Sequence, residues 1–271
     1  MDSPGPGRRR PIVFSHANGF PAGTYRVLFE AWRAAGHAVH AIEKFGHDPA
    51  YPVSGNWPKL RDQLIHFVER EVGEPAVLVG HSLGGLLSLL AACRRPELAA
   101  GLVMIDSPVV TGWRAHSLRV AKATGLIRRV SPGRVSRTRR HEWPSREAVQ
   151  RHFAAKALFA RWDPRVLADY VRAGFEERDG KTHLAFDRAV ETRIYDTLPH
   201  QFGTLLRRHP PKCPVAFLAG TQSAEMRQGG IAASKALAPG RYTLIEGGHL
   251  FPMERPDETA AAVLRWVEAM A

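Results

Sequence analysis

The sequence predicts an α/β fold: a mostly parallel sheet flanked by helices, with a helical lid inserted into it. Strand-sized apolar runs alternate with helical stripes toward both ends of the chain, and this alternation favours a parallel sheet. Between residues 113 and 200 the strand-like runs disappear and helical spacing takes over. The 271 residues therefore divide into a core, 1–112 and 201–271, and a lid, 113–200.

The elements before residue 75 begin the sheet. A buried strand is expected from Pro11 to His16, with Ile12–Ser15 as its apolar run, and a Gly/Pro-containing loop, Ala17–Gly23, follows it. Helical spacing and glycine stops then predict a helix from Thr24 to Gly36, a strand at His37–Glu43 and a helical stripe from Leu60 to Val72.

The segment Gly80–Gly85 joins the apolar run Pro75–Val79 to the helix-like run Leu86–Ala92. A Gly-x-Ser-x-Gly motif between a strand and a helix is typical of a nucleophile elbow, a turn so tight that small residues must surround the serine. The helix that follows directs backbone N–H groups and its positive end to the same point. We therefore expect Ser82 to be a nucleophile; the alternative is a glycine-rich turn that serves only close packing.

The elements after this motif complete the sheet and form the lid. Strands are expected at Gly101–Ile105, Pro214–Gly220 and Tyr242–Ile245, before a final helix. In the lid, Asp163-Pro164 is typical of a helix start. We interpret the aromatic side chains of the lid as its own core rather than as substrate contacts: Trp143, Phe153, Phe159, Trp162, Tyr170 and Phe175.

A nucleophilic serine needs a base, and the base needs a partner that orients it. His249 lies in a glycine-rich loop after the last predicted strand and before the last helix. Such a loop can bring an imidazole over the end of the sheet. Of the 13 histidines we expect His249 to be the base; the alternative is a loop histidine with a structural role.

Three segments together make the chain resemble an enzyme of the α/β-hydrolase fold, of the lid-bearing esterase type. They are Ser82 in its elbow, the early loop Ser15–Pro21 and the Gly248-His249 pair. The resemblance covers nearly the whole chain. It implies serine chemistry but does not identify the substrate.

The acid of the triad has two candidates. In most enzymes of this type it follows the strand after the lid, in a Gly-x-x-Asp-like turn, but this chain has Ser223 at that position. Asp106 ends the strand after the nucleophile helix, where dehalogenase-like and certain esterase branches place their acid, and Glu225 lies two residues beyond the usual position. Both keep the chain order serine, acid, histidine. If Asp106 is the acid, Ser223 could donate a hydrogen bond within the same network.

An oxyanion hole needs two backbone N–H donors. The geometry of an elbow makes Leu83, directly after the nucleophile, one of them. By resemblance the other comes from the loop after the first strand, where Phe20 is our first expectation. Asn18 is the alternative donor if the register of the loop differs. The alternative without a catalytic role is that the loop is a plain Gly/Pro turn.

The formal net charge of +12 arises largely from a cluster of arginines within residues 128–146. Neither aromatic interleaving nor a nucleic-acid motif accompanies the cluster, so we interpret it as a solvated basic face and expect no nucleic-acid partner. Recognition of an acidic substrate or a membrane surface is the alternative.

Other features exclude further classes. No apolar run is long enough to span a bilayer, and no apolar segment follows Arg8–Arg10 as a secretory signal would require. No Cys/His cluster has metal-ligand spacing, so neither metal nor cofactor is expected. Cys93 and Cys213 are expected to be free thiols in a cytoplasmic protein. The short run before Ile12 predicts an exposed sheet edge; the oligomeric state, a homodimer included, stays open.

The expected function is a serine hydrolase that cleaves a small or medium carboxylic ester through an acyl-enzyme. Alternatives use the same triad on another bond, as a C–C hydrolase, a proline iminopeptidase-like enzyme or a perhydrolase, because one fold supports many chemistries. A serine in the elbow argues against dehalogenase and epoxide hydrolase, which place aspartate there. The non-enzymatic alternative is a small-ligand-binding module, suggested by the missing aspartate after the lid.

Overall fold

The computed structural model describes residues 9–270. Its main sheet has six strands in the order β2-β1-β3-β4-β8-β9, and all neighbouring strands are parallel. The strands are β1 (Ile12–Ser15), β2 (Val39–Ala41), β3 (Ala76–His81), β4 (Ala99–Ile105), β8 (Val215–Gly220) and β9 (Tyr242–Ile245). The predicted fold class is confirmed. The expected absence of a secretory signal falls largely on residues 1–8, which lie outside the described residues.

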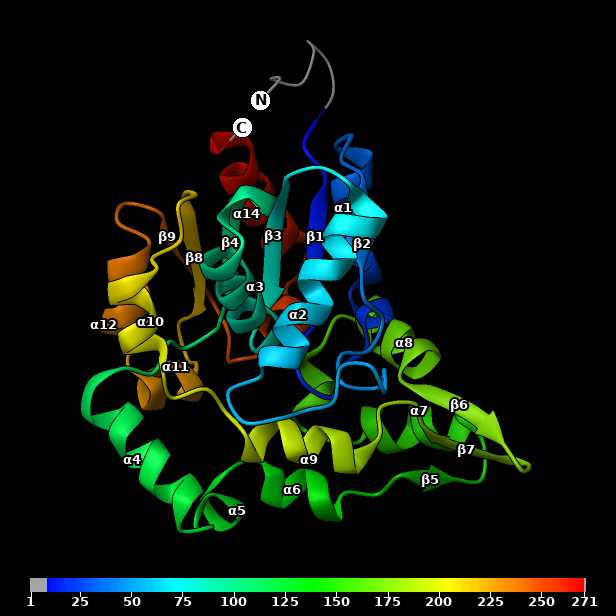
Figure 1. The fold of residues 1–271 in the computed structure, drawn as a ribbon. Helices are drawn as coiled ribbons and strands as arrows, with labels where there is room; N and C mark the ends of the chain where they lie inside the picture. The colour runs from blue at the N-terminus through cyan, green and yellow to red at the C-terminus, as the bar shows by residue number, and fades with distance from the viewer. Residues whose placement is uncertain (1–8, 271) are drawn as a thin grey trace.

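Helices cover both faces of this sheet (Figure 1). On one face lie α1 (Arg26–Ala34) and α14 (Pro256–Ala269), and on the other α2 (Pro58–Phe67) and α3 (Leu83–Arg94). Ile12 and Phe14 of β1 pack into the core on the side of α1 and α14, whereas Val13 packs into the core on the side of α2 and α3. This alternation follows from the two-residue period of a strand, and both faces are buried, as is usual in parallel sheets.

Residues 112–196 form a separate layer beyond the carboxyl ends of the strands (Figure 1). Its helices are α4 (Gly112–Ala123), α5 (Ile127–Val130), α6 (Gly133–Thr138), α7 (Arg146–Ala154), α8 (Pro164–Ala173) and α9 (Arg188–Asp196). The chain then returns to the core through α10 (Phe202–Arg208), α11 (Ala224–Gly229), α12 (Ile231–Leu237) and α13 (Phe251–Glu254).

This layer also contains strands, which corrects the expectation that strands are absent between residues 113 and 200. A second, antiparallel sheet has the order β5-β7-β6, with β5 at Glu142–Trp143, β6 at Phe175–Arg178 and β7 at Lys181–Leu184. Asp179-Gly180 joins β6 to β7 with positive φ at both residues, 52° and 71°, as a tight hairpin turn requires. The strands were not predicted because most of their side chains are polar, so they form no apolar run.

The aromatic side chains of this layer pack against one another, as predicted. The ring of Phe153 lies 4.7 Å from that of Phe159 and 5.3 Å from that of Tyr170, measured between centroids. Trp143, Trp162 and Phe175 complete the same buried cluster. The layer therefore has a core of its own that joins the core of the sheet.

Two further properties concern the described residues as a whole. Between residues 9 and 270, no helix combines the length and the hydrophobicity needed to cross a bilayer. Cys93 is buried and Cys213 is half-buried, and neither forms a disulfide.

The contact between α3 and β1 gives a first prediction. A Cβ at Gly84 of α3 would lie 1.9 Å from the carbonyl oxygen of Ser15 in β1, and backbone cannot yield cheaply. We expect Gly84→Ala to lower the free energy of unfolding by about 1–3 kcal/mol or more, measured by urea denaturation. Gly55→Ala is the control, because no atom lies within 4 Å of its Cβ position; its effect should stay within about 0.5 kcal/mol. Equal effects of the two substitutions would contradict the tight packing.

Candidate active site

Ser82 occupies a strained turn between β3 and α3. Its φ of 54° and ψ of −113° are unfavourable for a residue with a Cβ and persist only where the surroundings enforce them. A Cβ at Gly80 would lie 2.3 Å from the carbonyl carbon of Gly84, so the turn needs glycine at both positions. The predicted strand–turn–helix context is present, with Ser82 at the N-terminus of α3.

Ser82, His249 and Asp106 form a continuous line of hydrogen bonds. His249 Nε2 lies 3.0 Å from Ser82 Oγ, and His249 Nδ1 lies 2.7 Å from Asp106 Oδ1. An ionised carboxylate only accepts hydrogen bonds, so Nδ1 donates to Asp106 and Nε2 is left to accept from the serine hydroxyl. The three side chains follow β3, β9 and β4, whose carboxyl ends meet at one edge of the sheet.

Asp106 is completely buried and is held by donors from two further segments. Its Oδ2 accepts the backbone N–H of Gly220 at 2.7 Å, and its Oδ1 accepts the hydroxyl of Ser223 at 2.6 Å. A buried carboxylate without such partners would be very costly. Ser223, at the position where aspartate was expected, thus donates to the carboxylate that contacts His249.

Glu225 lies near the same imidazole but farther away. Its Oε2 is 4.0 Å from His249 Nδ1, and the side chain is 47% exposed. At this distance it contributes negative charge without a hydrogen bond. Of the two candidate acids, Asp106 is the one that contacts His249 directly.

The surroundings of His249 shift its pKa in opposite directions. Burial lowers the pKa, because it disfavours the charged imidazolium, whereas the hydrogen bond and the negative charge of Asp106 raise it, as does the charge of Glu225. The net result is a pKa above the ordinary value of 6.5. Asp106 contributes more than Glu225 to raising the pKa of His249.

The loop after β1 contains both Phe20 and Asn18, the two residues predicted as the second donor of an oxyanion hole. The backbone N–H of Phe20 donates to the carbonyl of Ala17 at 3.1 Å, and its ring packs on Trp162 and Tyr170. This N–H therefore already has an acceptor within its own turn. Asn18 lines the pocket beside Ser82 and Leu83, and the N–H of Leu83, in the first turn of α3, has no acceptor within its helix.

Sequence reasoning missed Tyr25 and His81. The backbone N–H of Ala17 donates to the Tyr25 hydroxyl at 3.2 Å, the hydroxyl lies 2.8 Å from His81 Nδ1, and His81 Nε2 lies 2.9 Å from the carbonyl oxygen of His249. Because a carbonyl only accepts, the proton of His81 is on Nε2 and Tyr25 donates to Nδ1. Burial lowers the pKa of His81 well below its ordinary value, which keeps it neutral. This chain of hydrogen bonds links the loop of Asn18 to the loop of His249.

A pocket of about 360 Å³ opens beside the serine. Apolar side chains from the segment before α4, from α4 and α9, and from the segment that runs into α10 line much of it: Val110, Leu118, Ile194, Leu198, Pro199 and Phe202. Tyr195, Arg114 and Gln228 add polar groups. Within the described chain, no group of three His, Cys, Asp or Glu side chains could hold a metal ion.

Comparison with known proteins gives the family of this fold. A family model described as "Alpha/beta hydrolase family" matches residues 12–262. The chain belongs to the α/β hydrolase family.

The chain is similar to several known proteins at low sequence identity. The chain is 25% identical over 233 residues to an abhydrolase domain-containing protein from Alternaria alternata, covering 72% of this chain and 84% of that protein. It is 30% identical over 134 residues to monoglyceride lipase from Rattus norvegicus, covering 46% of this chain and only 44% of the lipase. The solved structure of E-2-(acetamidomethylene)succinate hydrolase matches with a TM-score of 0.76 at 20% identity, over 97% of this chain and 92% of that chain. This last likeness shows the fold alone.

The environment of His249 gives a second prediction. In an NMR titration, His249 should be half-protonated above pH 6.5. Asp106→Asn removes the negative charge that contributes most to raising the pKa of His249. The midpoint of its titration should therefore move down toward or below pH 6.5. Glu225→Gln is the comparison, and its more distant and exposed carboxylate should give a smaller downward shift. A larger shift in Glu225→Gln would contradict the assignment of Asp106 as the main partner.

The Tyr25–His81 contact gives a third prediction. Tyr25→Phe leaves Nδ1 of the buried His81 without its donor, so we expect the free energy of unfolding to fall by about 1–3 kcal/mol, measured by urea denaturation. Tyr51→Phe is the matched control, because the Tyr51 hydroxyl bonds His66 in a less buried setting, where water can replace it. A loss no larger than that of the control would show that the buried link does not stabilise the fold.

Proposed function

We propose that this protein hydrolyses small or medium carboxylic esters through an acyl-enzyme on Ser82. The single observation that carries the proposal is the line of hydrogen bonds from Ser82 through His249 to Asp106, beside an apolar pocket. Relatives that include a monoglyceride lipase support ester chemistry over other bonds.

The mechanism assigns one role to each residue. His249 Nε2 takes the hydroxyl proton as Ser82 Oγ attacks the carbonyl carbon, and Asp106 orients the imidazolium that forms. The N–H groups of Leu83 and Asn18 stabilise the oxyanion. His249 then protonates the departing alcohol, the C–O bond of the ester breaks, and the acyl group stays on Ser82. Water, deprotonated by the same nitrogen, releases the carboxylic acid and restores the serine.

We propose further that residues 113–200 act as a lid over a core of 1–112 and 201–271. The pocket supports this division, because Leu118 of α4 and Ile194 of α9 face Ser82 across it. In this arrangement the lid walls the acyl or alcohol group of the substrate. A cytoplasmic location and a homodimer stay predictions.

The alternatives have less support. The binding-module reading depended on a missing aspartate after the lid, and Asp106 supplies a carboxylate from another strand. A C–C hydrolase, a proline iminopeptidase-like enzyme and a perhydrolase would use the same three side chains, and no further group of the pocket favours one of them.

The fourth prediction tests the proposed function. We expect the protein to hydrolyse p-nitrophenyl esters from acetate to laurate, with an optimum set by the length of the apolar pocket. Ser82→Ala should lower kcat about 10⁴–10⁶-fold, and Asp106→Asn about 10³–10⁴-fold, because it removes the orienting partner of His249. Glu225→Gln, the matched carboxylate control, should lower kcat by less than about tenfold, because its contact with His249 is longer and exposed.

Two outcomes would contradict the proposal. Labelling of Ser82 by a fluorophosphonate without hydrolysis of any ester would mean that the nucleophile acts on another bond. The absence of both labelling and hydrolysis would favour the binding module.

A further inference from the structure

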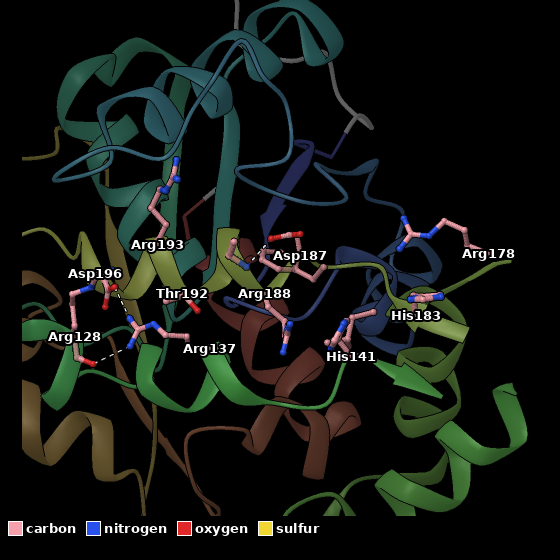
Figure 2. A pocket seen from close by; sticks show the side chains of 13 residues that line it. Arg128, Arg137, His141, Arg178, His183, Asp187, Arg188, Thr192, Arg193 and Asp196 are labelled. Atoms are coloured by element: carbon pink, nitrogen blue, oxygen red, sulfur yellow. Dashed lines mark hydrogen bonds and ion pairs between the residues drawn. The ribbon is translucent and has the colours of Figure 1, made fainter. Parts of the chain in front are cut away.

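A second cavity, of about 540 Å³, lies in the lid between α9, the β6–β7 hairpin and the segment from α5 to β5 (Figure 2). Five arginines and two histidines line it: Arg128, Arg137, Arg178, Arg188, Arg193, His141 and His183. We call it the arginine groove. It shares no lining residue with the pocket beside Ser82, so it is separate from the catalytic site.

The acidic side chains of the groove do not balance its arginines. Asp196 pairs with Arg137 at 2.9 Å, and Asp187 caps the N-terminus of α9 by accepting the backbone N–H groups of Ala189 and Val190. Among residues 9–270, Arg137–Asp196 is the ion pair between two lining residues, and the ring of His183 also lies 3.9 Å from the carboxylate of Glu142, which is not part of the lining. Several positive charges gathered around one concave surface create a potential that attracts anions.

Parts of the groove are held in place before any ligand binds. Arg188 donates to the carbonyl of Arg139 at 3.0 Å, and Arg137 donates to the carbonyl of Arg128 at 3.2 Å. Ser136 of α6 and Thr192 of α9 share a buried hydrogen bond of 2.7 Å. Guanidinium groups anchored on one side lose less freedom when the other side binds an anion.

The arginines extend along the groove rather than meeting at one point, and the two histidines lie among them. Figure 2 shows Arg128 and Arg137 near one end, Arg188 and His141 in the middle, and Arg178 with His183 at the other end. A single phosphate would contact only part of this row. A diphosphate carries its charge over a greater length, and guanidinium forks match phosphate oxygens in geometry.

We propose that the arginine groove is a binding site for a diphosphate-bearing small molecule, separate from the catalytic pocket. The volume suits a diphosphate together with an organic group, since small-molecule sites are commonly about 300–1,000 Å³. Asn18, Ser82 and His249 take no part in this binding.

The fifth prediction tests this site by isothermal titration calorimetry on the full chain at low salt. Inorganic pyrophosphate and ADP are the probes, and they distinguish a bare diphosphate from one attached to an organic group. We expect a Kd of about 1 mM or lower for at least one of them, weakening as salt rises. In the double variant Arg178→Gln/Arg188→Gln we expect binding about tenfold weaker or more, because the loss of even one charged hydrogen bond costs about that factor.

The control is Arg94→Gln/Arg265→Gln, which removes the same charge from two exposed arginines on α3 and α14. Its affinity should stay within about twofold of the natural chain. Thermal melting without ligand checks that both variants fold. Equal weakening in the two variants would mean that only net charge attracts the anion, and would overturn the proposal.

Two further results would overturn it as well. One is the absence of binding by either probe. The other is an oligonucleotide that binds far more tightly than both probes and is lost with the same two arginines, which would make the groove a nucleic-acid surface. Loss of ester hydrolysis in Ser82→Ala concerns the catalytic site alone, so the two proposals fail independently.

Discussion

The buried carboxylate of Asp106 is the interaction on which the rest of the site depends. Three donors from three segments reach it: the backbone of Gly220, the hydroxyl of Ser223 and the imidazole of His249. Leaving any of them out would expose a buried charge to an apolar interior, at a cost of several kcal/mol. One side chain therefore fixes the end of β8, the start of α11 and the loop that carries the histidine. The geometry at Ser82 follows from those three positions.

Both Ser82 and Asp106 have positive φ, at 54° and 42°. Each directly follows a central strand of the sheet, β3 or β4, whose neighbours bury it on both sides. Local strain of this kind persists only where the surrounding packing outweighs it. The same sharp turn explains the close backbone approaches around Gly80 and Gly84. It leaves no room for a side chain at these positions near the serine. Packing of the sheet thus supplies the energy that holds two reactive groups in unfavourable conformations.

The local parts of this site could be predicted from the sequence, and the non-local parts could not. The elbow depends on residues that are adjacent in the chain, so Gly80–Gly85 was sufficient to predict it. The choice between Asp106 and Glu225 depends on β4 lying beside β8, although more than a hundred residues separate them, and on the 4.0 Å that separates Glu225 from His249. Phe20 was chosen by motif register, which says nothing of the hydrogen bond to Ala17 that occupies its N–H. His81 stood inside the motif, but its partner Tyr25 is recognisable only once the fold brings the two together.

Helix α9 contributes residues to both the pocket beside Ser82 and the arginine groove. Its Ile194 and Tyr195 wall the catalytic pocket, whereas Arg188 and Arg193 line the arginine groove. Between them, the backbone carbonyl of Glu191 accepts the side-chain N–H of Asn18 at 3.0 Å, and its carboxylate pairs with Arg139 at 3.0 Å. Removing one partner of such a buried pair would leave an uncompensated charge, so the pair helps to hold α9 against the segment of Arg139. An anion that bound Arg188 would act on the same rigid helix that holds the loop of Asn18, and a rotation of α9 would move both the pocket wall and that loop.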